Sequence, residues 1–153
     1  MRIGVDIAGM SVKIGLVEGQ GIVSREVIKT DSDGQTPYEL IEKVADAVEM
    51  LLHKNKLTAG ACDGLGIACS GTVDVESGTV TYSNNIGWEN VSILDLLRQR
   101  FNILMALAND ADAATRGEVI CGAAKGKNSA VLLTLGTGVG GVILNKKIFS
   151  GSL

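Results

Sequence analysis

The first thirty residues constrain the fold of this chain most strongly, because they contain three strand-like segments joined only by tight turns. Residues 2–7 alternate in polarity, and the segments at about 11–17 and 21–29 are rich in Val, Ile and Leu, as strands are. Residues 19–21, Gly-Gln-Gly, supply the second turn. Strands joined so closely pair as antiparallel neighbours, so the sequence predicts an opening meander.

The clearest helix follows the meander. Thr36 and Glu39 fit a capping box around Pro37, which is typical of a helix start. Apolar residues then recur at helical spacing from Leu40 to Leu52 and form one face. The charged residues of this helix lie mostly off that face, and we expect them to be solvated: Glu42, Lys43, Asp46 and Glu49.

Strands and helices alternate in the rest of the chain. Residues 65–69 predict a buried strand, followed by a hairpin that bends at Gly78. A helix is expected over about 92–101 with Ser92 as its cap, and a strand over 103–108. A meander followed by alternating helices and strands is typical of an α/β sheet with helices on its faces.

Bulk composition excludes several classes of protein. At 153 residues, with 46% hydrophobic and 20% charged residues, the chain can form an ordered core. A net charge of −3 argues against a nucleic-acid binder, and no apolar stretch is long enough to span a bilayer. The three cysteines show no metal-binding spacing, so we interpret them as small buried residues in a reducing cytoplasm.

A glycine-rich loop over residues 136–141 follows an apolar run at 131–135 that predicts a buried strand. Its glycines let backbone N–H groups close on an anion, which favours a phosphate site. A plain hairpin turn is an equally good interpretation, because residues 142–144 look like a returning strand. That strand also argues against a dinucleotide-binding crossover, which requires a helix after the loop.

Two carboxylates stand next to predicted turns at strand ends. Asp6 precedes the first turn, where it either holds a metal through water or simply ties down the turn. Asn109 and Asp110 lie where a strand meets a third helix, an edge at which open α/β sheets bind ligands. In the simpler interpretation one of them caps the helix. In the other, Asp110 accepts a proton from a substrate hydroxyl.

Residues 83–90 form a polar segment without periodicity that contains the only tryptophan, Trp88. Clustered amides beside an indole suit a ligand with many hydroxyl groups. An Asx-rich turn with Trp88 packed on the core explains the segment equally well.

In this order, the segments resemble the ROK family of sugar kinases and repressors along the whole chain, in particular its glucokinase-like members. The longest similarities are Asn-Asp-Ala-Asp-Ala-Ala at 109–114, in the catalytic segment, and Leu-Thr-Leu-Gly-Thr-Gly-Val-Gly-Gly at 133–141, the second phosphate motif. Residues 6–10 resemble the first phosphate motif, 66–74 the strand and turn beside the sugar, and 85–88 the sugar-side loop.

The resemblance implies a lobe of the actin-like ATPase (ribonuclease H-like) fold, with a mixed sheet and helices on its faces. It also implies ATP-dependent phosphorylation of a glucose-like hexose at its primary hydroxyl, with Asp110 as general base. The residues implied for sugar binding are Asn109, Gly71, Asn84 and Asn85. The residues implied for binding ATP, with Mg²⁺ shared by its phosphates, are Asp6, Ala8, Gly9, Met10, Lys13, Thr137, Gly138 and Gly140.

Departures from the family pattern limit what the resemblance implies. Ala8 and Met10 replace a glycine and a threonine of the first phosphate motif, and Ser70 stands where proline is common. The family's Glu-x-Gly-His segment and cysteine-rich zinc site are absent from these residues. We therefore expect an N-terminal lobe at 1–122, a linker and the first hairpin of a truncated second lobe at 123–153, and little activity of the isolated chain.

Two further expectations concern the class of protein and its assembly. ROK repressors carry a DNA-binding domain ahead of the first phosphate motif, for which a start at Met1 leaves no room, so a kinase is favoured. The alternative is a non-catalytic sugar-binding module or a sugar-responsive ROK regulator. Residues 130–144 are apolar and would lack sheet partners in a lone chain; exposed strand edges pair with other copies, so we expect a homodimer.

Overall fold

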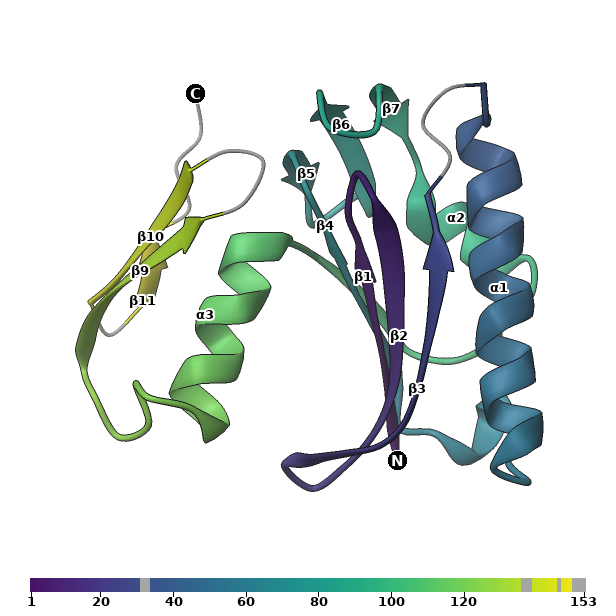
Figure 1. Cartoon of the computed structure of the whole chain (residues 1–153), viewed down its shortest axis with the longest axis horizontal. Coiled ribbons are helices and arrows are strands. Elements are labelled where there is room, and N and C mark those ends of the chain that lie inside the picture. The colour runs from purple at the N-terminus through teal and green to yellow at the C-terminus, as the bar shows by residue number, and fades with distance from the viewer. Residues whose placement is uncertain (31–33, 136–138, 146, 150–153) are drawn as a thin grey trace.

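The computed structural model describes residues 1–30, 34–135, 139–145 and 147–149. Its central element is a five-stranded mixed sheet in the order β3-β2-β1-β4-β8 (Figure 1). The strands are β1 (Arg2–Ile7), β2 (Ser11–Glu18), β3 (Gly21–Lys29), β4 (Leu65–Cys69) and β8 (Met105–Asn109). β1, β2 and β3 pair as antiparallel neighbours, which confirms the predicted meander, whereas β1, β4 and β8 run parallel.

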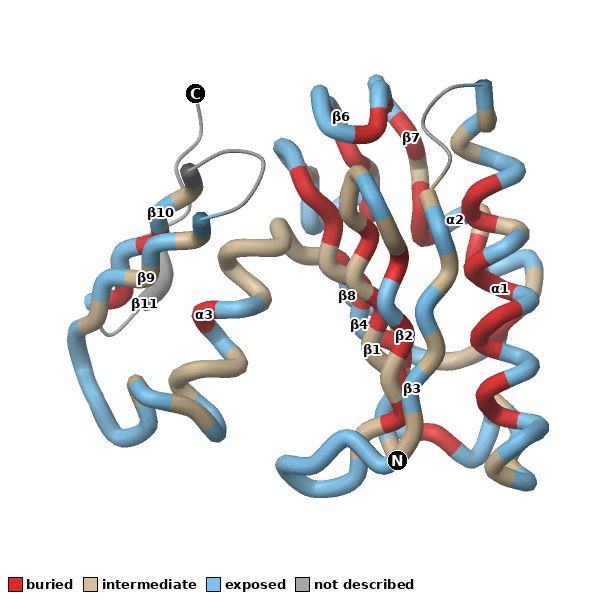
Figure 2. The backbone as a smooth tube through the Cα atoms, viewed as in Figure 1, coloured by how far each residue is buried: buried red, intermediate tan, exposed pale blue. Residues whose placement is uncertain are grey.

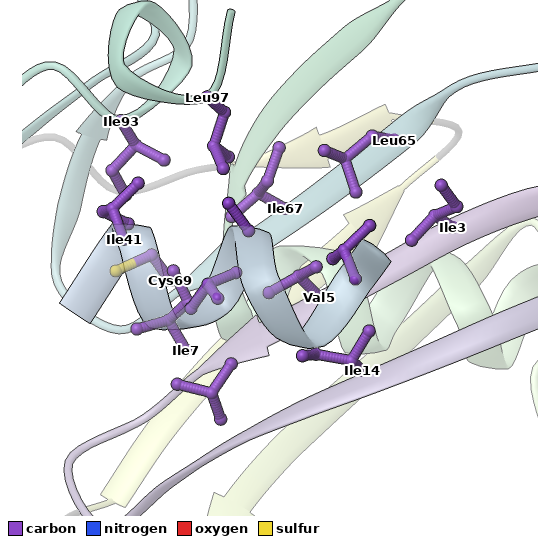
Figure 3. Close-up of a cluster of buried hydrophobic side chains, with 14 of the residues drawn as sticks. Ile3, Val5, Ile7, Ile14, Ile41, Leu65, Ile67, Cys69, Ile93 and Leu97 are labelled. Carbon is purple, nitrogen blue, oxygen red and sulfur yellow. The ribbon is translucent and has the colours of Figure 1, made fainter. Parts of the chain in front are cut away.

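Two helices, α1 (Pro37–Lys54) and α2 (Ile93–Arg98), cover one face of this sheet (Figure 1). The predicted capping box is present: Glu39 N donates to Thr36 Oγ1 at 3.2 Å, and Thr36 N donates to the Glu39 carboxylate at 2.8 Å. Buried residues lie along β1, β4 and α1 (Figure 2), and side chains from β1, β4, α1 and α2 point toward one another in the main core (Figure 3). No helix in the described ranges is long and apolar enough to cross a membrane.

A second, three-stranded sheet follows β4 and contains β5 (Thr72–Asp74), β6 (Thr79–Ser83) and β7 (Trp88–Val91). β5 and β6 form the hairpin expected around Gly78, but the sequence did not predict β7. Its alternation is broken because Glu89 and Asn90 are both exposed between two buried residues. Trp88 is buried, so the interpretation of an indole packed on the core is confirmed.

The second helix differs from its prediction. α2 covers six residues rather than about ten, and Ser92 at its N-cap position makes no side-chain capping bond. The Ser92 hydroxyl instead lies 3.2 Å from the hydroxyl of Thr79. This bond joins the start of α2 to β6, so the hydroxyl serves the packing of the two elements rather than the helix end.

The acidic residues of α1 are not simply solvated, as the sequence suggested. Glu42, Asp46 and Glu49 each lie 2.9 Å from the Arg100 guanidinium, which follows α2. The hydrogen bonds that Arg100 donates to Glu49 and then to Asp46 raise the pKa of Arg100 above its already high value. This cluster ties α1 to the end of α2, far along the sequence.

The chain continues into α3 (Asp110–Cys121) and a third sheet, formed by β9 (Ser129–Leu135), β10 (Val139–Asn145) and β11 (Lys147–Phe149). Figure 1 shows α3 between this sheet and the large one. The predicted hairpin is confirmed by the antiparallel pairing of β9 and β10, and the division at residue 122 stays a prediction.

Residues 131–135 form the predicted strand as part of β9, but the prediction that this strand is buried is wrong. α3 contacts β9 and β10, and Val142 and Leu144 are buried. In contrast, four apolar side chains of these strands are exposed: Val131, Leu133, Leu135 and Ile143. Alternate residues of a strand point to opposite faces, and no described element covers this second face. The expected homodimer remains a prediction that this exposed face motivates.

Candidate functional site

The parallel strands of the large sheet end at one edge, where the candidate site lies. β1, β4 and β8 pair so that Ile7 aligns with Cys69, and Cys69 aligns with Asn109. This register brings Asp6 and Asp110, which are distant in sequence, to the same edge. The carboxyl edge of a parallel sheet is the usual ligand site in α/β folds.

Asn109 is the N-cap of α3, so the capping interpretation is confirmed for this residue. Its Oδ1 accepts hydrogen bonds from Ala111 N at 2.9 Å and Asp112 N at 3.2 Å. Its Nδ2 donates to the carbonyl oxygen of Gly71 at 2.9 Å. An amide oxygen has two lone pairs and the NH₂ group has two protons, so Asn109 retains one proton for a ligand and can only donate to it.

Asp110 is the first residue of α3 and is half-buried. One carboxylate oxygen, Oδ1, accepts from Ala111 N at 2.9 Å. Within the described part of the chain the carboxylate forms no ion pair, and Oδ2 accepts no hydrogen bond. Asp110 therefore presents one open, negatively charged oxygen beside the remaining Asn109 donor.

The buried thiol of Cys69 links the two carboxylates electrostatically. Burial raises the pKa of Cys69 to about 12, and the negative charges of Asp110 and then Asp6 add to the effect. Both carboxylates thus act on one buried group at the end of β4. The expectation that all three cysteines are buried is wrong for Cys121, which is exposed on α3.

These environments predict different thiol reactivities. In the folded protein at pH 8 we expect Cys121 to react with DTNB within minutes, whereas Cys62 and Cys69 react only after unfolding. Burial raises the pKa of Cys62 as well, and a thiol with a pKa near 12 is ionised to only about 10⁻⁴ at this pH. Cys121→Ser should remove the fast phase; a second fast thiol in that variant would contradict the buried environments.

The first turn, between β1 and β2, is closed by its own backbone. Ala8 N donates to Ser11 O at 3.2 Å. Among the described residues, the Asp6 carboxylate accepts no hydrogen bond from these amides. It pairs instead with Lys13 at 3.2 Å, the residue opposite it on β2, so it links the two strands that flank the turn. The Met10 side chain is 81% exposed. No group of three or more His, Cys, Asp or Glu side chains within the described ranges could hold a metal ion.

Gly71 forms the wall of the site opposite α3, in a conformation that requires glycine. Its φ is +112°, and a Cβ there would overlap the Tyr82 carbonyl oxygen and lie 2.7 Å from Ser83 Cβ. The preceding Ser70 is buried, with its hydroxyl 3.4 Å from that of Ser83. Ser70 N also donates to Ile7 O at 3.2 Å, a bond that proline could not make.

No sequence pattern predicted the Ser70–Ser83 pair, because its two members lie on separate segments. Asn84 and Asn85 are exposed in the β6–β7 connection. The Tyr82 hydroxyl donates to Asn84 Oδ1 at 3.4 Å, and Asn85 O approaches Gly9 so closely that a Cβ there would be 2.9 Å away. Asn85 thus adjoins the first turn.

The second phosphate motif is only partly described. Thr137 and Gly138 lie outside the described residues. Gly140 belongs to β10 and pairs with Thr134 of β9, whose Oγ1 would lie 2.5 Å from a Cβ at position 140.

Comparison with known proteins identifies the family. The profile of the ROK family matches residues 2–153. The chain belongs to the ROK family. Its mixed sheet, with an antiparallel meander followed by parallel strands, has the actin-like ATPase fold of ROK sugar kinases.

Its ROK relatives include kinases and repressors. A glucokinase of Streptomyces coelicolor is 32% identical over 153 residues, which cover 99% of this chain and 46% of the relative. A ROK family glucokinase from Streptomyces griseus, crystallised with glucose and AMPPNP, matches with a TM-score of 0.85 at 31% identity, over 99% of this chain and 46% of that chain. A xylose repressor of Caldicellulosiruptor bescii is 30% identical over 98% of this chain and 38% of the repressor. The chain thus spans less than half the length of these relatives.

Proposed function

We propose that residues 1–153 carry the sugar-binding side and the general base of an ATP-dependent kinase that phosphorylates a glucose-like hexose at its primary hydroxyl. The observation that carries the proposal is the Asn109–Asp110 pair, which offers one open N–H donor beside one open carboxylate oxygen. Such a pair matches a sugar hydroxyl, which both accepts and donates a hydrogen bond. Similarity to ROK glucokinases supports the same reaction.

In this proposal, Asp110 accepts the proton of the primary hydroxyl as its oxygen attacks the γ-phosphorus of ATP. The open oxygen of the Asp110 carboxylate, Oδ2, is the atom that acts as the general base. Asn109 donates to a neighbouring sugar hydroxyl, and Gly71, Asn84 and Asn85 form the sugar-side wall. Holding the hydroxyl in line supplies much of the rate in phosphoryl transfer.

The first turn and the glycine loop at 136–141 are the proposed supports for the ATP phosphates. Two features of the described residues fit an anion: the Lys13 ammonium beside the turn and the glycine at position 9. Asp6 is the carboxylate at this edge that would hold Mg²⁺ through water, and Mg²⁺ neutralises phosphate charge when bound. The Met10 side chain contributes no hydroxyl to this site.

A regulator or sugar-binding module without catalysis is the second candidate. Two observations favour it: the methionine at position 10 and the similarity to a xylose repressor. The two candidates differ in phosphoryl transfer rather than in sugar binding. For either one, the exposed apolar face of β9 and β10 supports association into a homodimer.

Glucose titration into the 153-residue polypeptide, followed by ¹H–¹⁵N NMR, tests the proposal. We expect millimolar binding that shifts the side-chain amide of Asn109, and almost no ADP release with ATP and Mg²⁺, because the chain covers only 46% of the Streptomyces coelicolor glucokinase. Asn109→Ala should abolish the glucose-dependent shifts of the remaining amides, whereas Asn128→Ala, an exposed position beyond α3, should retain all of them. If glucose, mannose and xylose all leave the Asn109 amide unshifted, the proposed sugar site is refuted.

A measurement of phosphoryl transfer distinguishes the kinase from the non-catalytic regulator or sugar-binding module. The natural gene product that contains residues 1–153 should release ADP in a glucose-dependent manner. Sugar binding without ADP release in that protein would favour the regulator.

A further inference from the structure

Thr30, which directly follows β3, donates two hydrogen bonds to the first turn. Its Oγ1 donates to the carbonyl oxygen of Ala8 at 2.8 Å. Its backbone N donates to the carbonyl oxygen of Met10 at 3.2 Å. Thr30 is partly buried and does not belong to either phosphate motif. Both carbonyl groups that flank Gly9 are therefore held toward β3.

The β6–β7 connection also approaches the first turn. The Asn85 carbonyl oxygen would lie 2.9 Å from a Cβ at position 9, closer than real Cβ atoms usually approach an oxygen. The turn thus has neighbours on two separate elements, Thr30 after β3 and Asn85 between β6 and β7.

The hydrogen bond from the Thr30 hydroxyl to Ala8 O fixes the direction of the Gly9 backbone amide. In a trans peptide, the C=O of one residue and the N–H of the next point in opposite directions. Because the Ala8 carbonyl points to Thr30 Oγ1, the Gly9 N–H points away from Thr30. This N–H donates to no residue that the structure describes, whereas Ala8 N is used within the turn by Ser11 O. The Gly9 amide is therefore an open donor of the turn.

We propose that Thr30 is a positioning residue, which aims the Gly9 amide at a phosphate oxygen of the nucleotide. This inference rests on the proposed function, because that function brings the phosphates to the first turn. The Met10 side chain has no hydroxyl that could donate to a phosphate. In this proposal the Gly9 amide, held in place by the Thr30 hydroxyl, donates that hydrogen bond instead. Without the Thr30 hydroxyl, the peptide group between Ala8 and Gly9 can rotate, and the Gly9 N–H no longer has a fixed direction.

The test compares three variants of the 153-residue chain with inorganic tripolyphosphate as the probe, followed by ¹H–¹⁵N NMR. Thr30→Val removes the hydroxyl and keeps the shape and the backbone bond. Thr30→Ser restores a hydroxyl. Thr81→Val is the matched control, because Thr81 Oγ1 also donates to a backbone carbonyl, that of Thr72 at 3.1 Å, away from the first turn.

We expect Thr30→Val to raise the dissociation constant for tripolyphosphate about fivefold, the effect of one hydrogen bond, and to suppress the shift of the Gly9 amide. Thr30→Ser should restore both, and Thr81→Val should change neither. A dissociation constant for Thr30→Val within twofold of the wild-type value, or a wild-type chain that does not bind tripolyphosphate, would overturn the inference.

Glucose titration of the same samples separates this inference from the proposed function. If tripolyphosphate binding depends on the Thr30 hydroxyl while glucose binds to no variant, the sugar-kinase proposal fails and the role of Thr30 stands. If glucose binds normally and Thr30→Val leaves the dissociation constant for tripolyphosphate unchanged, only the inference about Thr30 fails.

Discussion

Asp110→Asn is expected to lower glucose-dependent ADP release by about 10²–10⁴-fold, the usual contribution of a general base, in the natural gene product that contains residues 1–153. Asparagine has the same size and keeps an oxygen that can accept from Ala111 N, as Asp110 Oδ1 does at 2.9 Å. It cannot take a proton from the sugar. The loss should therefore appear in kcat, with glucose affinity changed much less.

Asp112→Asn provides the matched control for this experiment. Asp112 lies in the same first turn of α3, so the substitution makes the same change of charge near the same helix end. We expect at most about a fivefold loss of activity, since a charge at a helix N-terminus contributes only about 0.3–1 kcal/mol. Equal losses in both variants, or an unchanged kcat in Asp110→Asn, would contradict the assignment of the base.

Gly71→Ala is expected to lower the free energy of unfolding by about 3 kcal/mol, through backbone strain and overlap together. The positive φ of Gly71 disfavours any side chain, and the new methyl group would overlap the Tyr82 carbonyl and Ser83. Urea unfolding of the 153-residue chain measures this loss. Because Gly71 O accepts from Asn109 Nδ2, glucose binding should weaken as well in the fraction that remains folded.

Gly34→Ala separates strain from overlap. Gly34 has a φ of +114°, close to that of Gly71, but a Cβ there would have no atom within 4 Å. We expect a loss of about 1 kcal/mol, from backbone strain alone. If both substitutions lower the free energy of unfolding by the same amount, then β6 moves to accommodate the new methyl group at position 71. In that case the close contact between Gly71 and β6 does not position the site.

Local patterns in the sequence predicted the elements that have local causes. The capping box at Thr36 and Glu39 and the apolar period of α1 are both contained in one segment, and both are confirmed. The meander followed from short turns that leave antiparallel pairing as the direct solution. β7 was missed because its polar residues interrupt the alternation, and its pairing with β6 is decided by a neighbour rather than by its own sequence.

The candidate site was predicted as residue types and positions, but not as contacts. Asn109 and Asp110 were recognised at a strand–helix junction, yet the sequence left open which of them caps α3. The structure assigns the cap to Asn109 and leaves one Asp110 oxygen open. Thr30 was not singled out, because a threonine after a strand has no distinctive pattern, and its partners Ala8 and Met10 lie 22 and 20 residues before it.

The sequence by itself determined helix α1, the meander, the alternation of helices and strands along the chain and the resemblance to the ROK family. Each of these depends on the identity and spacing of nearby residues. Only the tertiary structure decided which groups face one another at the sheet edge. Strand register aligns Ile7, Cys69 and Asn109, and burial at that alignment raises the pKa of Cys69 between two carboxylates. Tertiary structure also decided that the apolar residues of β9 are exposed, because an apolar side chain is buried only where another element packs against its face.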